Sequence, residues 1–445
     1  MSRETGALAG KLASIAGPEW VLEGAAASPF AVDGVAPRLA VRPGTQEEVA
    51  RVVAACAAAR AAMAPWGGGT AMGLGNPPKR LDVAVVLDRL SRIVEFDHAN
   101  LNVSAEAGVT LARLQEVLEE KREFLPLDPA QPERVTVGGL VQSNATGPTR
   151  QQYGSARDWV LGLRVVLPGG ERVRSGGKVI KNVSGYDMNK LFIGGFGTMG
   201  IVTEATFKLL PLPAARATVV GVFGTVAAMG AAVQRTLESF LLPEALEALD
   251  PGTLAGLSLA PRAGYGLAVS LAGSAETVAR QARDFTKLFT DAQALAAVSL
   301  DAVHAAEAWP AIRDVHARVP GEKAVVKIAV PIGKTLDLFG AAEDLLNGRG
   351  GRGAVTAHAG AGVVRLTLPI EPGTAVVPLR EGLAALRAKA EGEDGSLVLE
   401  TAPLALKTSF DAWGRVRDGM TVTRRLKAEM DPEALMNPGR FIGGI

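Results

Sequence analysis

The chain has 445 residues, 48% of them hydrophobic and 21% charged, with a formal net charge of +1. At roughly 150 residues per domain, this length allows two or three domains, and it can bury a core without disulfides or structural metals. The near-zero net charge gives no electrostatic footprint for nucleic acid, and no basic run suggests an anionic membrane. The single cysteine, Cys56, excludes an intrachain disulfide and an iron–sulfur cluster bound by this chain alone.

No targeting or transmembrane segment is expected. The first residues lack a sustained apolar region, and the uncharged stretch from Ala217 to Val233 is shorter than the roughly 20 residues that a spanning helix needs. The four histidines do not pair at metal-ligand spacing. We therefore expect a cytoplasmic chain with no metal site.

The first half of the chain predicts alternating helices and strands. Thr45 and Glu48 are spaced as a capping box for a helix that runs to about Met63. A second helix is expected over residues 111–123, and strands are expected at 82–88, 93–97 and 101–108. Turn-rich regions at 65–75 and 126–150 separate these elements, and short strands alternate with glycine-rich turns from Tyr153 to Pro211.

The second half predicts a mixed sheet covered by helices. Helix-like runs at 225–239, 275–289, 334–346 and 378–390 alternate with strand-like runs at 217–223, 266–271, 323–331, 363–369 and 396–400. This order leaves open two similar βαβ units.

One dinucleotide-binding motif fails in its context. Residues 195–200 match G-x-G-x-x-G, which in a Rossmann fold follows a strand and opens a helix. Here a helix-like segment precedes the motif, and the strand-like run IVTEATFKLL follows it. The acidic residue expected about 20 positions further on is also missing. We therefore expect no Rossmann site.

Two other glycine clusters are better candidates for a dinucleotide site. Backbone N–H groups converge on phosphate where glycine permits unusual dihedral angles. The cluster Gly67-Gly68-Gly69-Thr70 suits such a nest, with the Thr70 hydroxyl as a further donor. The cluster at 137–144 would let the backbone approach a ligand closely, and its Ser143 and Asn144 side chains can donate to it. Each cluster taken alone is also compatible with an ordinary turn.

Three segments then identify a resemblance: PWGGGT, PLDPAQPERVTVGGLVQSNATG and GYDMNKLFIGGFGTMGIVTEATFKLLP. They resemble the FAD-binding domain of the vanillyl-alcohol oxidase and p-cresol methylhydroxylase family, over about residues 34–213. Within this family, residues 150–191 and the tail are most similar to the FAD-binding subunits of bacterial glycolate oxidases, whereas 215–400 match weakly.

The resemblance implies an α+β fold. A two-subdomain FAD-binding domain of the p-cresol methylhydroxylase type is followed by an α+β cap domain with a mostly antiparallel sheet. The expected bounds are an N-terminal segment 1–33, the FAD-binding domain 34–213, the cap 214–412, and a C-terminal segment 413–445 that returns to the first domain.

The resemblance also implies roles for individual residues. The first loop would bind the pyrophosphate, the next group would line the flavin, Gly200 to Val202 would contact the adenine end, and the residues near 153 would brace the isoalloxazine loop. The residues of the pyrophosphate loop are Trp66, Gly67, Gly68, Gly69 and Thr70, and those that would line the flavin are Asp128, Pro129, Thr136, Gly138, Gly139, Ser143 and Asn144. The adenine end would be contacted by Gly200, Ile201 and Val202, and the isoalloxazine loop would be braced by Tyr153, Gly154 and Arg157. Asn437 belongs to the C-terminal segment that returns to this domain.

Departures from the family pattern carry further expectations. The region of the first loop has no His or Cys for covalent attachment, so we expect non-covalent FAD. The segment that resembles the family's His-rich metal region has a single histidine, His358, in a Gly/Ala loop, which again predicts no metal.

Oxidation of a small 2-hydroxyacid would need a cation for the carboxylate, a base for the hydroxyl proton, and a C2 hydrogen aimed at the flavin. The candidate cations are Lys327 and Arg365, and the candidate base is His358. A solvent-facing Lys327, an acid-paired Arg365 and a bystander His358 are equally compatible with the sequence. Lys178 and Lys181 are candidates to stabilise reduced flavin.

Three functions stay open on this basis. The chain is a flavin subunit that passes electrons to a second flavoprotein subunit and an iron–sulfur subunit, or a self-sufficient D-2-hydroxyacid dehydrogenase, or an assembly subunit with a non-catalytic flavin. A peripheral attachment to the inner membrane would follow from such a complex.

Overall fold

A computed structural model describes residues 3–178, 186–416 and 418–445. The first sheet has four strands in the order β1-β2-β4-β3, and β2, β4 and β3 run parallel. Helices α1 (Arg3–Ala16) and α2 (Gln46–Ala58) share one apolar core with this sheet. Its strands are β1 (Val21–Glu23), β2 (Leu39–Val41), β3 (Met63–Trp66) and β4 (Val83–Val86).

The second sheet has five antiparallel strands in the order β5-β6-β10-β8-β9. Alternate residues such as Ala205 and Phe207 pack on helices α3 (Leu111–Glu119), α4 (Val137–Ser143) and α6 (Ala156–Trp159), which cover one face. The strands are β5 (Ile93–Asp97), β6 (Asn102–Glu106), β8 (Val160–Val166), β9 (Arg172–Gly176) and β10 (Ile201–Lys208). Short elements beside them are α5 (Arg150–Tyr153), α7 (Asn189–Phe192), β7 (Glu123–Phe124) and β11 (Leu210–Pro211).

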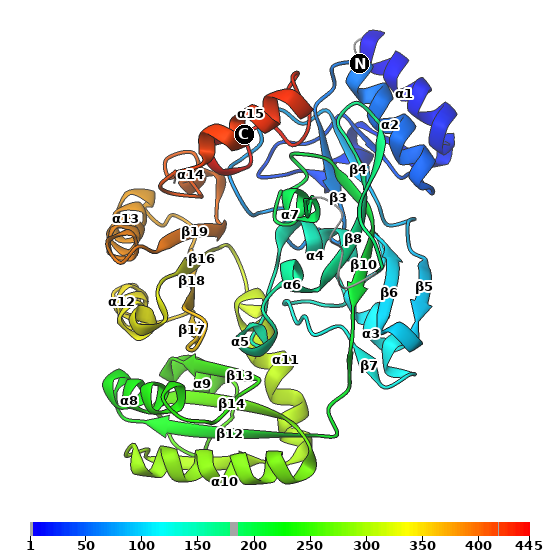
Figure 1. The fold of residues 1–445 in the computed structure, drawn as a ribbon. Coiled ribbons are helices and arrows are strands. Elements are labelled where there is room, and N and C mark those ends of the chain that lie inside the picture. Colours follow the sequence, from blue (N-terminus) through cyan, green and yellow to red (C-terminus); the bar gives the residue numbers. More distant parts are fainter. Residues whose placement is uncertain (1–2, 179–185, 417) are drawn as a thin grey trace.

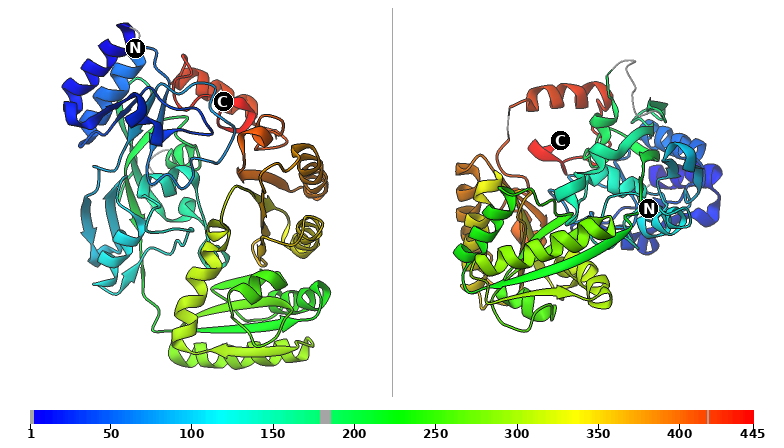
Figure 2. Two further views of the ribbon diagram at one scale, coloured as in Figure 1. Left: turned by 180° about the vertical axis from the view of Figure 1, so that it is seen from behind. Right: turned by 60° about the horizontal axis from the view of Figure 1, so that its bottom comes forward.

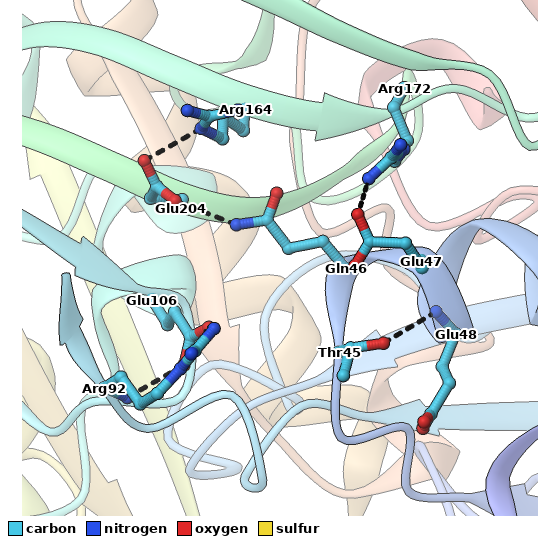
Figure 3. Close-up of polar contacts among 9 residues, drawn as sticks. All are labelled: Thr45, Gln46, Glu47, Glu48, Arg92, Glu106, Arg164, Arg172 and Glu204. Carbon is cyan, nitrogen blue, oxygen red and sulfur yellow. Dashed lines mark hydrogen bonds and ion pairs between the residues drawn. The ribbon is translucent and has the colours of Figure 1, made fainter.

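The two sheets are joined by polar contacts at the start of α2 (Figure 3). The side chain of Thr45 accepts from the backbone N–H of Glu48, which fixes the helix start. The next residues reach the five-stranded sheet: Gln46 donates to the buried Glu204 at 2.8 Å, and Glu47 pairs with Arg172. These bonds fix the orientation of the two subdomains and therefore the shape of the space between them.

The cap is a single eight-stranded antiparallel sheet in the order β15-β12-β14-β13-β17-β18-β16-β19. It consists of two βαββαβ units that join through β13 and β17. The second half therefore contains two similar units, a possibility that the sequence left open. The first unit contains β12 (Ala215–Phe223), α8 (Val226–Leu237), β13 (Ala245–Leu249), α9 (Pro251–Gly256), β14 (Tyr265–Gly273), α10 (Ala275–Asp291) and β15 (Ala296–Leu300). The second contains β16 (Lys323–Ala329), α12 (Thr335–Asn347), β17 (Ala354–His358), β18 (Val363–Pro369), α13 (Val376–Gly392) and β19 (Ser396–Thr401).

Helices α8, α10, α12 and α13 cover one face of this sheet and form the largest apolar core with it. Helix α11 (Ala302–Arg318) connects the two units on the opposite face. On that face, strands β16, β18 and β19 are turned toward the N-terminal half of the molecule (Figures 1 and 2). After α14 (Leu404–Lys407) and α15 (Met420–Met430), the chain returns to the first sheet, where Met436 bridges to Met63 in parallel.

The structure confirms the α+β class and the antiparallel cap, and it corrects several local expectations. Helix α2 ends at Ala58, because Met63 already belongs to β3. The glycine cluster at 137–144 is the helix α4 with its C-cap rather than a turn. The strands β13, β15 and β17 and the helix α11 were not predicted.

Candidate active site

A cavity lies between the two N-terminal subdomains. Most of the residues proposed for a dinucleotide meet there, although they come from four separate stretches of chain. The predicted residues that line it are Gly67, Gly68, Gly69, Thr70, Thr136, Gly138, Gly139, Ser143, Ile201, Val202 and Asn437.

The loop that follows β3 presents unused donors to this cavity. Within the described ranges, the backbone N–H groups of residues 67–71 donate to no protein acceptor. The loop has little freedom to move: a Cβ on Gly68 would lie 1.6 Å from the carbonyl oxygen of Arg134, and one on Gly67 would lie 2.3 Å from Thr136 Oγ1. Gly69 has a φ of +78°, which favours glycine. The loop is therefore a fixed array of donors suited to an anion.

Helix α4 forms the facing wall. Thr136 caps it by accepting from the N–H of Gly139 at 3.2 Å, and Gly138 packs so closely that a Cβ would lie 2.8 Å from that of Ala107. The glycines of α4 therefore serve close packing, and their N–H groups are already bonded within the protein. At the end of the helix Asn144 is left-handed, and its Oδ1 is buried without a protein partner.

The remaining walls come from β10 and from the C-terminal segment. Ile201 and Val202 line the cavity, whereas Gly200 lies behind them against Val165 and Val166. Asn437 donates from its side chain to the carbonyl of Phe196 at 2.6 Å. The C-terminal return of the chain thus closes the cavity that the N-terminal half forms.

A second cavity adjoins the first, since Thr70, Ala71, Ser143 and Phe196 line both. Its floor is the open face of the cap sheet. Among the predicted residues it is lined by Pro129, Asn144, Lys327 and Arg365, together with Thr70 and Ser143.

Lys327 and Arg365 are cross-strand partners on β16 and β18 and both reach this second cavity. Arg365 lies 3.7 Å from Glu400, and its Nε has no hydrogen-bond partner. Burial lowers the pKa of Lys327 to about 8, an effect that Glu400 opposes. The side chain of Lys327 makes no hydrogen bond or ion pair with another described residue and is available to an anionic ligand. Arg365 already pairs with Glu400 and donates to the carbonyl of Thr146 at 3.4 Å, so an anionic ligand would share its charge with Glu400.

His358 lines neither cavity and lies at the end of β17 rather than in a loop. Its Nδ1 is 2.5 Å from Glu247, and its Nε2 is buried with no protein partner. Burial lowers the pKa of His358 to about 3 and raises the pKa of Glu247, which the charge of Arg365 opposes. The imidazole is therefore neutral, and its Nε2 can accept a proton only when Glu247 is ionised, because a protonated carboxyl would occupy Nδ1.

Several predicted residues lie outside both cavities. Asp128 is partly buried, accepts from the N–H of Thr149, and has a pKa that loss of hydration raises to about 6. Trp66 packs edge-on against Phe30. The others are Tyr153, whose hydroxyl donates to Glu244 in the cap at 3.1 Å; Gly154, with a φ of +76°; and Arg157, which is exposed.

The two lysines proposed to act on reduced flavin are not at these cavities in the described structure. Lys178 pairs with Glu95 on the uncovered face of the five-stranded sheet. Lys181 lies outside the described residues.

Sequence reasoning missed several residues of the site. Gln142 in α4 accepts from the N–H of Gly197 and donates to the carbonyl of Gly200, which ties two cavity walls together. Arg440 lines the first cavity and lies three residues after the predicted Asn437, in the sequence Asn-Pro-Gly-Arg. His316 lines the second cavity, with both ring nitrogens bonded to Thr356 and Thr367. It lies in helix α11, which was not predicted, so no local pattern pointed to it.

Comparison with known families identifies the class of protein to which these cavities belong. The model of an FAD-binding domain matches residues 37–176, and the model of the C-terminal domain of FAD-linked oxidases matches residues 212–441, more than half of the chain. The chain belongs to the FAD-linked oxidases.

Relatives of this FAD-linked oxidase include two glycolate oxidase subunits. GlcD of Bacillus subtilis is 28% identical over 420 residues, which cover 91% of this chain and 89% of that protein. GlcE of Escherichia coli is 40% identical over 124 residues, 28% of this chain and 35% of that protein. The structure of p-cresol methylhydroxylase with substrate bound matches with a TM-score of 0.79 and 17% identity, over 99% of this chain and 97% of that one. This match establishes the fold.

The cavities fit the cofactor of this FAD-linked oxidase. The unused N–H groups of residues 67–71 suit a pyrophosphate, and the unpartnered Oδ1 of Asn144 lies where the first cavity opens into the second. No helix in the described ranges is long and apolar enough to cross a membrane. Among those same residues, no group of three His, Cys, Asp or Glu side chains is placed to bind a metal.

Proposed function

We propose that this chain oxidises a small 2-hydroxyacid, of the glycolate or D-lactate kind, at a non-covalently bound FAD. The observation that carries the proposal is the second cavity, which adjoins the dinucleotide cavity and has two cations on its floor: Lys327, which is unpaired among the described residues, and Arg365, which also faces Glu400. A carboxylate is the ligand that a guanidinium and an ammonium side by side bind best.

The residues would divide the work as follows. Bound FAD supplies the acceptor for the hydride from C2. Arg365 and Lys327 bind the carboxylate and so fix the direction of C2. His358 is the proposed proton acceptor; since it lines neither cavity, we expect the hydroxyl proton to reach Nε2 through one bridging water. This role requires an ionised Glu247; burial raises the pKa of Glu247 and works against it, whereas the charge of Arg365 opposes that rise.

For the cofactor, we propose that residues 67–70 bind the pyrophosphate, that Pro129 and residues 136–144 line the flavin, and that Ile201 and Val202 contact the adenine end. Asp128, Tyr153, Gly154 and Arg157 would act from behind the site, through the loop between α4 and β8. The same assignment implies an FAD-binding domain over 34–213, a cap over 214–412, and flanking segments 1–33 and 413–445.

We also propose that the chain works in a complex, as its likeness to two glycolate oxidase subunits supports. Its partners would be a second flavoprotein subunit and an iron–sulfur subunit that accept the electrons. A cytoplasmic location, with attachment to the membrane through such partners, stays a prediction.

Anaerobic spectroscopy of the purified chain tests the proposal. Glycolate or D-lactate should bleach the flavin absorbance of the isolated protein within the time of one catalytic turnover. Flavin that stays oxidised with both acids, but is reduced when partner subunits are added, would make this chain an electron relay. Flavin that no acid and no partner reduces would leave only a structural role.

A further inference from the structure

Two buried cations surround the second half of the glycine-rich loop. The side chain of Lys407 is 0% exposed, and Arg440 is 2% exposed. They reach the loop from different parts of the chain, Lys407 from the end of α14 and Arg440 from the C-terminal return. Neither residue was among the candidates for cofactor binding.

These two cations bind five successive carbonyl groups. Arg440 donates to the carbonyls of Ala71, Met72 and Leu74, at 3.5, 2.7 and 2.8 Å. Lys407 donates to the carbonyls of Gly73 and Gly75, the latter at 3.0 Å. The loop is thus polarised along its length. Residues 67–71 present unused N–H groups to the first cavity, and residues 71–75 present their carbonyls to the cations.

The positive charge at this place exceeds its counter-charge. Lys407 pairs with Asp33 at 2.8 Å, and that carboxylate is itself 7% exposed. Arg440 bonds only to carbonyl groups and to the side-chain oxygen of Asn437 among the described residues. A buried cation without a carboxylate partner is costly in a folded protein. Burial accordingly lowers the pKa of Arg440 to about 10.

We propose that Lys407 and Arg440 form a cation clamp that fixes loop 67–75 for the pyrophosphate of FAD, and that the bound cofactor offsets the charge buried in the clamp. Arg440 lines the cavity and would act on the phosphate charge directly. Lys407 does not line it and is a positioning residue, which acts through the loop and through its charge. The inference depends on FAD binding and is independent of the hydroxyacid that is oxidised.

A purely structural role makes a different prediction for Asp33. If Lys407 acts only through its hydrogen bonds, Lys407→Met should weaken FAD binding, whereas Asp33→Asn keeps an oxygen that can accept from Lys407 and should leave FAD binding unchanged. If the charge of the clamp matters, Lys407→Met removes a positive charge and Asp33→Asn removes a negative one. The two substitutions should then change cofactor affinity in opposite directions.

The test measures dissociation constants of FAD and of ADP for apoprotein from which the flavin has been removed. ADP contains the pyrophosphate and adenosine without the isoalloxazine ring. For Lys407→Met we expect both constants to rise by about 10- to 100-fold, the effect of losing hydrogen bonds from a charged group. For Asp33→Asn we expect both constants to fall below those of the wild type. Lys287→Met, at an exposed lysine of α10 paired with Asp291, is the matched control and should change neither.

Three results would overturn the clamp: wild-type affinity in Lys407→Met, a loss for FAD that ADP does not share, or an affinity in Asp33→Asn that does not exceed that of the wild type. Should Lys407→Met fail to fold, as judged by circular dichroism, the ADP affinity of Asp33→Asn still decides the matter. None of these measurements uses a hydroxyacid, so failure of the clamp is distinct from failure of the proposed reaction.

Discussion

The tightest constraint on the dinucleotide cavity is at Gly68, and it allows a sharp test. A Cβ at this position would lie 1.6 Å from the carbonyl oxygen of Arg134 and 2.6 Å from its carbonyl carbon. Both are backbone atoms, which cannot turn aside as a flexible side chain would. The substitution Gly68→Ala must therefore displace the loop by roughly 1 Å or more, because van der Waals contact begins near 3.5 Å.

The expected size of the effect follows from the donors that the loop presents. A hydrogen bond to a charged group is worth about 1.5–3 kcal/mol. If the displacement breaks two of the bonds that the N–H groups of residues 67–71 offer to the pyrophosphate, affinity falls by at least about 3 kcal/mol. Since 1.4 kcal/mol is a factor of ten, the dissociation constant of FAD should rise more than about 100-fold.

Flavin content after purification and titration of the apoprotein with FAD measure this loss. The matched control is Gly340→Ala in helix α12, where an added Cβ meets nothing within 4 Å. That variant should keep its FAD and gain about 0.5–1 kcal/mol in free energy of unfolding, because alanine is the better helix former. Wild-type FAD affinity in a folded Gly68→Ala protein would refute the assignment of this loop to the pyrophosphate.

Other substitutions test the second cavity and its support. Because the pKa of Lys327 is lowered to about 8, the side chain is a cation only below that pH, and KM for the hydroxyacid should rise above pH 8. Lys327→Met should raise KM at pH 7 by tenfold or more with FAD retained. A kcat/KM that increases as the pH rises through 8 would instead make Lys327 the base. His358→Ala should lower kcat by about 100- to 10,000-fold with FAD retained, and a loss below tenfold would remove His358 from the reaction. Tyr153→Phe deletes one hydrogen bond to the buried Glu244 and should lower the free energy of unfolding in urea by about 1 kcal/mol. An unchanged urea midpoint would show that this hydrogen bond adds nothing to stability.

Periodicity predicted the long elements of the cap because their apolar residues repeat at the spacing of a helix or a strand. Periodicity failed where the amino-acid composition of a segment and its surroundings in the fold favour different structures. Strand β13 has the sequence ALEAL, whose residues favour helix, yet it pairs with strands on both sides in the middle of the sheet. Helix α11 was missed although it is long, since it contains Pro310. In both cases, contacts with the rest of the sheet override the local preference.

Local sequence patterns and contacts in the fold likewise distinguish the site residues that were predicted from those that were missed. Glycines in clusters, such as 67–69, are visible in sequence because few other roles explain them. The residues that support them have no local signature. Lys407 looks like any helix-terminal lysine, and only the fold shows that its side chain is buried among the carbonyls of a loop more than 300 positions away.

The arrangement of charge links these findings into one argument. The chain as a whole is nearly neutral, with a formal charge of +1, so its composition gives no hint of an anionic ligand. Yet Arg440 and Lys407 lie around the first cavity, and Lys327 and Arg365 lie on the floor of the second. Folding therefore gathers cations at two adjoining places, one suited to a pyrophosphate and the other to a carboxylate. That separation suits a ligand with phosphate at one end and a reacting partner with a carboxylate at the other, which is what FAD and a 2-hydroxyacid together provide.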